Sequence, residues 1–231
     1  MKSFGIAATL GFAFVALMFG QAVGYDAMSA AVGPDLTPAG YDGAAVAVAL
    51  LVANPVQVVT LGLAAQMTGE NLFAYLALDV PARRAVIIAV AGLALLILAG
   101  DGLTLALGRS LASPFELDIH RTALAKGALL PLWIAMTVVS PVGEEILFRG
   151  FLFRGFIHEP RNALPGVLAI SLIWALLHVQ YDGFGTFLIF VLGVYLGLVR
   201  LWFGSTTLVI LLHMLVNLDS VVETAIVLGW L

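Results

Sequence analysis

The sequence contains no cysteine, and charged residues make up only 10% of its 231 positions. Without cysteine the chain has no disulfide, no thiol nucleophile and no cysteine-ligated zinc. Soluble domains are about half apolar and about a quarter charged, whereas this chain is 62% hydrophobic with a mean hydropathy of +1.10. The composition therefore predicts an integral membrane protein, whose catalysis, if any, must come from Glu, Asp, His, Ser, Thr or a metal held by oxygen and imidazole.

Apolar runs long enough to cross a bilayer recur along the whole chain. Because a span takes about 20 residues, they predict an all-α, polytopic membrane helix bundle of about seven to eight transmembrane helices. The first run is expected to be an uncleaved span, with a cleaved signal peptide as the alternative. The spans are expected near residues 5–23, 44–66, 86–107, 124–142, 164–181, 184–203 and 205–218, with the apolar tail 219–231 extending the last one or forming a half-helix.

The placement of basic residues between the spans predicts the orientation. Lys and Arg favour cytoplasmic loops, and the segment 25–43, which is expected to be an external loop, contains acids but no bases. The N-terminus is therefore expected to be cytoplasmic, in a multi-pass protein of the cell inner membrane. The residues expected inside are Lys2, Arg83, Arg84, Arg154, Arg161 and Arg200, and those expected outside are Arg109, Arg121 and Lys126.

Two glutamates and an arginine interrupt the apolar stretch TVVSPVGEEILFRGFLFRG. A charge near the bilayer centre costs about 2.5–3.5 kcal/mol on insertion scales, so such residues need a purpose. Pro141 is predicted to break or kink the span, with a new helix starting there. In that helix Glu145 and Arg149 are i and i+4 and can pair. Glu144 is about 100° from Glu145 around the helix axis and therefore points in another direction. Glu145 and Arg149 are interpreted as an internal ion pair, and Glu144 as the carboxylate left for chemistry.

Two histidines in apolar runs are expected to lie near Glu144. His178 is about 21 Å into its predicted span, at a depth similar to that of Glu144 on the preceding antiparallel helix. His213 and Asn217 are i and i+4, so they project from one face of the last span. These four residues are predicted to converge inside the bundle. The alternative is a structural polar cluster, and Asp101 and Asp219 are minor candidates to line or support the site.

This set of side chains suits the hydrolysis of a peptide bond. A carboxylate beside an imidazole can hold and deprotonate a water. A second imidazole with an amide donor can stabilise the oxyanion that forms when this water attacks a carbonyl. Glu144, His178 and His213 would also make a plausible zinc site with a water in the open position. The metal-free interpretation needs no further component, so no cofactor is expected, with zinc as the alternative.

Three motifs in this order resemble those of the CPBP family of intramembrane proteases, which includes the type II CAAX prenyl endopeptidases and the abortive-infection proteins. EEILFR matches the signature EExxxR, HMLVN matches HxxxN, and His178 with the aromatic Trp174 four residues earlier matches a second motif. The resemblance covers about residues 137–220. The chain is interpreted as a single membrane domain, 1–231, with a catalytic core at 120–220 and N-terminal spans in 1–119.

The resemblance implies an intramembrane endopeptidase, of glutamic or metal-dependent type, that cleaves near the C-terminus of a CAAX-like or other membrane-associated substrate. It implies that Glu144 and His178 activate water and that His213 and Asn217 stabilise the oxyanion, supported by Glu145 and Arg149. The expected partners are membrane lipids and a peptide or lipidated protein, and no nucleic acid.

The chain departs from the pattern of this family in two respects. The second motif usually has Phe where this chain has Trp174, whose expected role is packing against the histidine. Eukaryotic prenyl endopeptidases are described with eight spans, against the seven full spans counted in this chain.

Two other hypotheses about the function remain. A non-catalytic immunity or scaffold protein would keep the polar cluster for binding. A proton-coupled transporter is disfavoured, because it would show paired repeats and broken helices in both halves.

Overall fold

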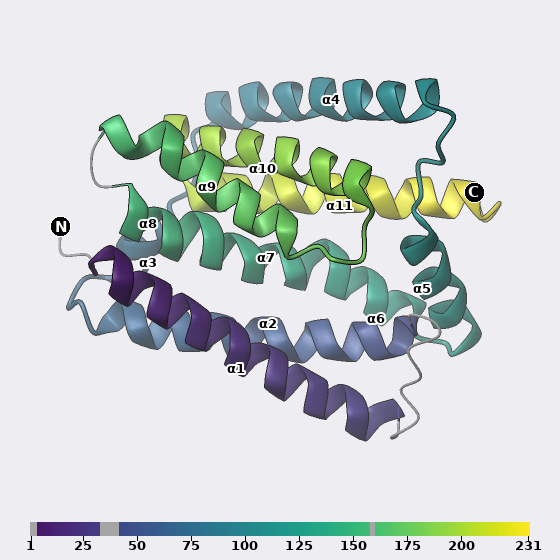
Figure 1. Ribbon diagram of the computed structural model, residues 1–231, viewed down its shortest axis with the longest axis horizontal. Helices are drawn as coiled ribbons and strands as arrows, with labels where there is room; N and C mark the ends of the chain where they lie inside the picture. The colour runs from purple at the N-terminus through teal and green to yellow at the C-terminus, as the bar shows by residue number, and fades with distance from the viewer. Residues whose placement is uncertain (1–3, 33–41, 158–159) are drawn as a thin grey trace.

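The computed structural model describes residues 4–32, 42–157 and 160–231. Within these ranges the chain is helical and no strand occurs. Six helices are long and apolar enough to cross a membrane, and another apolar helix is shorter (Figure 1). The long ones are α1 (Ile6–Val32), α2 (Gly43–Gln66), α4 (Arg83–Ala106), the continuous run Leu129–Phe156, α10 (Gly183–Phe203) and α11 (Thr206–Val227); the shorter one is α9 (Ala163–Leu176).

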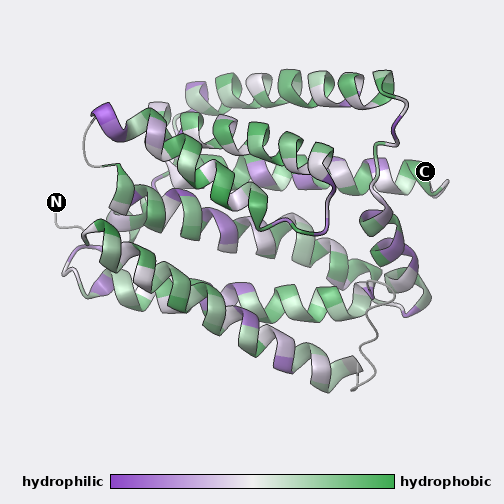
Figure 2. Ribbon diagram, viewed as in Figure 1, coloured by the Kyte–Doolittle hydropathy of each residue, from purple (hydrophilic) through white to green (hydrophobic). Residues whose placement is uncertain are grey.

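Hydrophobic residues cover most of these helices, while hydrophilic ones gather on α5 (Pro114–Ala125) and interrupt the run Leu129–Phe156 and α11 (Figure 2). The predicted all-α, polytopic membrane bundle is confirmed by the six long helices and α9. Three short elements complete the described chain: α3 (Leu72–Leu76), α5 (Pro114–Ala125) and the 3₁₀ turn η3 (Pro160–Asn162).

Polar side chains start several of the helices. Asp42 caps α2 by accepting a hydrogen bond from the backbone N–H of Ala44 at 2.9 Å, and Asp182 caps α10 in the same way. Ser113 and Glu116 form a capping box at the start of α5. Such caps satisfy N–H groups that have no partner within the helix. They place the beginnings of α5 and α10 at defined residues, and both beginnings line the site described below.

The central helix runs without a break from Leu129 to Phe156, so the predicted break at Pro141 is wrong. It consists of α6 (Leu129–Ile134), a π-helical segment (Ala135–Val139), α7 (Ser140–Glu145), a second π-helical segment (Ile146–Leu152) and α8 (Phe153–Phe156). The wider π-helical segment, which ends two residues before Pro141, accommodates the missing N–H and the ring, and the helix continues through the proline.

The first helix is longer than the sequence suggested. Residues 25–32 belong to α1, whereas they were expected to start an external loop. The first Gly-Pro pair of this segment stands at 33–34, so no strong helix breaker precedes it. Residues 33–41 of the expected loop lie outside the described residues, and so does Lys2, which was expected to be cytoplasmic. The last two residues of that segment are described: Asp42 caps α2, and Gly43 is its first residue.

The central helix lies between the α1–α2 pair and the group formed by α9, α10 and α11 (Figure 1). Its contact with α2 is close at Gly143, where an added Cβ would lie 2.1 Å from Oδ1 of Asn54. Gln57 of α2 also donates a hydrogen bond to the carbonyl oxygen of Gly143 at 3.0 Å. Glycine therefore allows α2 to approach the helix one residue before Glu144.

Candidate active site

Glu145 lies at the centre of a buried charged cluster. Its Oε1 accepts a hydrogen bond from Nη1 of Arg149 at 2.9 Å and another from Nδ1 of His213 at 2.7 Å. Arg149 also donates through Nη2 to the carbonyl oxygen of Gly193 at 3.0 Å. The predicted ion pair is thus present, and it fastens the central helix to α10 and α11. Because each charge has a partner, the cost of burying it is partly offset.

Glu144 points away from this cluster, as its place on the helix predicted, and it lines a cavity. Its Oε1 accepts a hydrogen bond from Oγ of Ser140 at 2.5 Å, and its Oε2 accepts one from Nε1 of Trp174 at 2.6 Å. The side chain is half-buried, whereas Glu145 is fully buried. Of the two adjacent carboxylates, Glu144 is therefore the one that a molecule in the cavity can reach.

His178 lies just beyond the end of α9, in the connection to α10. The predicted span 164–181 is too long, because α9 ends at Leu176 and Asp182 already caps the next helix. Nδ1 of His178 lies 2.8 Å from the carbonyl oxygen of Trp174. A carbonyl only accepts hydrogen bonds, so this contact assigns a hydrogen to Nδ1, and in the neutral ring Nε2 is then the acceptor nitrogen.

His213 and Asn217 project from one face of α11, as predicted. Asn217 donates through Nδ2 to the carbonyl oxygen of Met136 at 2.8 Å, which fixes the orientation of the amide and uses one of its two N–H hydrogens. Nδ1 of His213 is held by Glu145, so its Nε2 is the nitrogen free to contact another molecule.

The four predicted residues Glu144, His178, His213 and Asn217 line one cavity of about 1080 Å³. Ligand cavities in proteins commonly measure about 300–1,000 Å³, so this one is large enough for a peptide segment. Glu145 and Arg149 are absent from its lining. The cavity extends toward α5 and the start of α10, beyond the three motifs EEILFR, His178 with Trp174, and HMLVN.

Glu116 and Tyr181 belong to this cavity but were not predicted. Oε1 of Glu116 accepts hydrogen bonds from Oγ of Ser220 at 2.7 Å and from the hydroxyl of Tyr181 at 3.2 Å. Burial, and then the charge of Glu116, raises the pKa of Tyr181 well above its ordinary value, so the phenol stays protonated and donates. The capping-box sequence SPFE was the available signal for Glu116, but it indicates a helix start and not a site.

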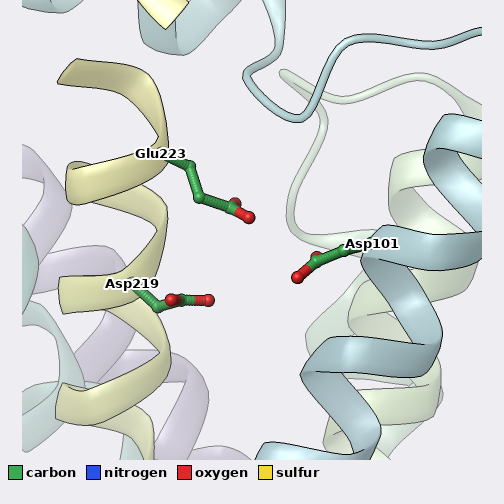
Figure 3. A group of neighbouring side chains, drawn as sticks. All are labelled: Asp101, Asp219 and Glu223. Atoms are coloured by element: carbon green, nitrogen blue, oxygen red, sulfur yellow. The ribbon is translucent and has the colours of Figure 1, made fainter. Parts of the chain in front are cut away.

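A separate acidic cluster lies between α4 and α11 (Figure 3). Asp101 points from α4 toward Asp219 and Glu223, and one oxygen of each residue lies within 4.8 Å of the others. Carboxylate oxygens suit hard cations such as Ca²⁺ or Mg²⁺. Neither Asp101 nor Asp219 lines the cavity of Glu144.

The suggested zinc ligands are arranged differently from this acidic cluster. Among the described residues, the donor atoms of Glu144, His178 and His213 do not form a group within 4.8 Å of one another. In the present geometry they lie around a shared cavity, and zinc binding would need them to move closer together, because Zn–N and Zn–O bonds are about 2.0–2.2 Å long.

Residues 126–218 match a family model described as type II CAAX prenyl endopeptidase Rce1-like. The matched segment contains EEILFR, His178 and HMLVN, and therefore all four residues predicted to carry the chemistry. The resemblance that was inferred from these motifs is confirmed at the level of the family. No curated protein and no solved structure matches the chain.

Proposed function

We propose that this chain is an intramembrane endopeptidase that cleaves near the C-terminus of its substrate, on the premise that residues 126–218 match the type II CAAX prenyl endopeptidase Rce1-like family. The family implies a CAAX-type protease acting on a membrane-associated protein. The finer proposal is that the substrate is a CAAX-like or other lipidated peptide, and that the protein lies in the cell inner membrane with its N-terminus in the cytoplasm.

One observation carries the catalytic part of the proposal. Glu144 lines a cavity together with two imidazoles and an amide, while the adjacent Glu145 is turned away into a buried ion pair. A purely structural cluster has no need to expose one carboxylate and bury the next. Intramembrane charges that face a cavity commonly serve substrate or proton pathways.

In the proposed reaction Glu144 and His178 hold the attacking water. Nε2 of His178 accepts one hydrogen of this water, because Nδ1 already donates to the carbonyl oxygen of Trp174. Glu144 accepts the other hydrogen, takes that proton as the water oxygen attacks the scissile carbonyl carbon, and then delivers it to the nitrogen of the departing amine. The C–N bond breaks, and a carboxylic acid and an amine leave the site.

His213 and Asn217 are proposed to stabilise the negative charge on the carbonyl oxygen. Asn217 has one N–H left after its bond to Met136. His213 donates from Nε2 only when both ring nitrogens carry hydrogen, because Nδ1 is already donating to Glu145. The carboxylate of Glu145 compensates the charge of that imidazolium. No metal is assigned to the reaction, and zinc held by Glu144, His178 and His213 is the alternative.

The experiment is cleavage of synthetic C-terminal peptides by the purified protein, with products identified by mass spectrometry. We expect a farnesylated CAAX peptide to be cut at one bond and its unprenylated version to be cut more slowly. Glu144→Gln should lose about 100- to 10,000-fold in rate, the usual contribution of a general base. Glu223→Gln is the matched control, since this acid of α11 lies outside the cavity lining. Cleavage by neither the wild type nor the control would favour the scaffold hypothesis.

A further inference from the structure

We propose that Trp174 is the positioning residue that sets both members of the pair activating the water. This inference rests on the proposed function and goes beyond the packing role expected for an aromatic residue at this position. The indole Nε1 donates to Oε2 of Glu144 at 2.6 Å. The backbone carbonyl oxygen of the same residue accepts from Nδ1 of His178 at 2.8 Å.

The indole bond completes the fixation of the Glu144 carboxylate. Ser140 holds Oε1 at 2.5 Å and Trp174 holds Oε2 at 2.6 Å, so each carboxylate oxygen has its own donor. Each oxygen keeps a further lone pair for a water. A carboxylate with one donor can turn about its last torsion, which is broad for Glu. Two donors from different helices hold the carboxylate plane in one orientation.

The indole ring is itself held rigidly. It is 2% exposed, and the guanidinium carbon of Arg149 lies 4.6 Å from the ring centroid. The rings of His178 and His213 pack edge-on against it, with centroid distances of 5.0 and 5.4 Å. An added Cβ at residue 193 would lie 3.0 Å from Cε3 of the indole, so Gly193 leaves the room that this larger ring needs.

Phenylalanine at position 174 separates the two contributions of this residue. Trp174→Phe keeps a buried aromatic ring and the carbonyl that orients His178, but it removes the N–H donor to Glu144. We expect kcat to fall about 10- to 100-fold, the effect of losing one hydrogen bond to a charged group. KM should stay within about twofold, because the lost bond orients a catalytic group and does not bind substrate.

Trp133→Phe is the matched control. Trp133 lies on the same continuous helix as Glu144, and its indole Nε1 is buried without a hydrogen-bond partner in the described structure. This variant should keep wild-type kcat and KM. If Trp174→Phe is folded and has the kcat of the Trp133→Phe control, the indole donor does not position Glu144 and the proposal is overturned.

A second measurement does not depend on activity or on the stability of Trp174→Phe. The sequence has four tryptophans, so changing Trp133, Trp202 and Trp230 to Phe leaves Trp174 as the source of the remaining ¹⁵N-indole resonance. Its short bond to a carboxylate should shift the indole proton downfield, and Glu144→Ala should return it toward the position of a free indole. An unchanged resonance contradicts the proposal. If instead the wild type cleaves no peptide but the shift is seen, the proposed function fails and the positioning contact stands.

Discussion

Glu145 and Arg149 form an ion pair with a distance of 2.9 Å between Oε1 and Nη1, at a place where their side chains are 0% and 1% exposed. The same carboxylate oxygen also accepts from His213 of α11. The pair therefore links the helix that carries Glu144 to the helix that carries the proposed oxyanion donors. The two glutamates of the EExxxR motif therefore differ in role: Glu145 belongs to the buried ion pair, and Glu144 faces the cavity.

Removal of one partner from this pair should destabilise the fold strongly. Arg149→Met removes the guanidinium that pairs with the buried Glu145 carboxylate, and breaking such a pair costs about 3–5 kcal/mol. The melting temperature in detergent micelles should fall markedly, and peptide cleavage should be lost with it. Arg109→Met is the control, since Arg109 pairs with Asp182 at the surface, where their side chains are 43% and 56% exposed. A control that melts as low as Arg149→Met would contradict this assignment.

The close approach of α2 to the central helix predicts a steric effect at Gly143. In Gly143→Ala the new Cβ would lie 2.1 Å from Oδ1 of Asn54, so α2 or the Asn54 side chain must move. Overpacking of this kind typically costs about 1–3 kcal/mol, and the displaced helix should also lower kcat because Glu144 is the next residue. Thermal unfolding and peptide cleavage measure the two effects.

Gly100→Ala is the matched substitution for Gly143→Ala. Gly100 lies inside α4, and no atom would come within 4 Å of an added Cβ there. Alanine is favoured over glycine in a helix interior by about 0.5–1 kcal/mol. The variant should be as stable as the wild type or slightly more so, with unchanged activity. Equal loss of stability in both glycine variants would show that the contact with Asn54 does not set the cost.

The hydroxyl of Tyr181 should make stability depend on alkaline pH. Its pKa is raised well above the ordinary value by burial and by Glu116. The folded state therefore keeps the proton at a pH where the unfolded chain loses it. The stabilisation from this group is fully present below about pH 10, the ordinary tyrosine pKa, and is lost as the pH rises above it.

Tyr181→Phe tests this pH dependence. The variant lacks the ionisable hydroxyl, so its free energy of unfolding should fall less steeply above about pH 10 than that of the wild type. Below that pH it should be the less stable protein, because Glu116 loses a donor. If the free energies of unfolding of the wild type and the variant fall in parallel as the pH rises above about 10, Tyr181 ionises alike in the folded and unfolded states.

Asn217 should affect the chemical step and not substrate binding. Asn217→Ala removes a proposed oxyanion donor, whose loss typically costs about 100- to 1000-fold in kcat. KM should change little, because the interaction forms with the transition state. Steady-state kinetics on a cleaved peptide give both constants. A change in KM with an unaltered kcat would assign Asn217 to substrate binding.

The sequence was informative wherever helical spacing alone decides the geometry. The offset between Glu144 and Glu145 separated their directions, and the i, i+4 spacing placed His213 and Asn217 on one face of α11. Both arguments need only a regular helix around the residues concerned. The membrane class followed from composition, because soluble domains are typically about a quarter charged, whereas this chain is 10% charged.

The sequence was misleading where tertiary packing overrides a local rule. Pro141 continues a helix because a π-helical segment precedes it, and proline rules do not predict such segments. The hydrogen bond from Trp174 to Glu144 joins residues 30 positions apart, and those from Tyr181 and Ser220 to Glu116 span 65 and 104 positions. Only the folded chain brings these groups together.

The most direct test of the proposed mechanism compares wild type and Glu144→Gln on one farnesylated CAAX peptide, each before and after treatment with a metal chelator. We predict that the wild type cleaves the peptide equally well with and without chelator, and that Glu144→Gln is about 100- to 10,000-fold slower although it melts like the wild type. Loss of wild-type activity on chelation, restored by added zinc, would contradict the metal-free account. Full activity of folded Glu144→Gln would remove Glu144 from the chemistry altogether.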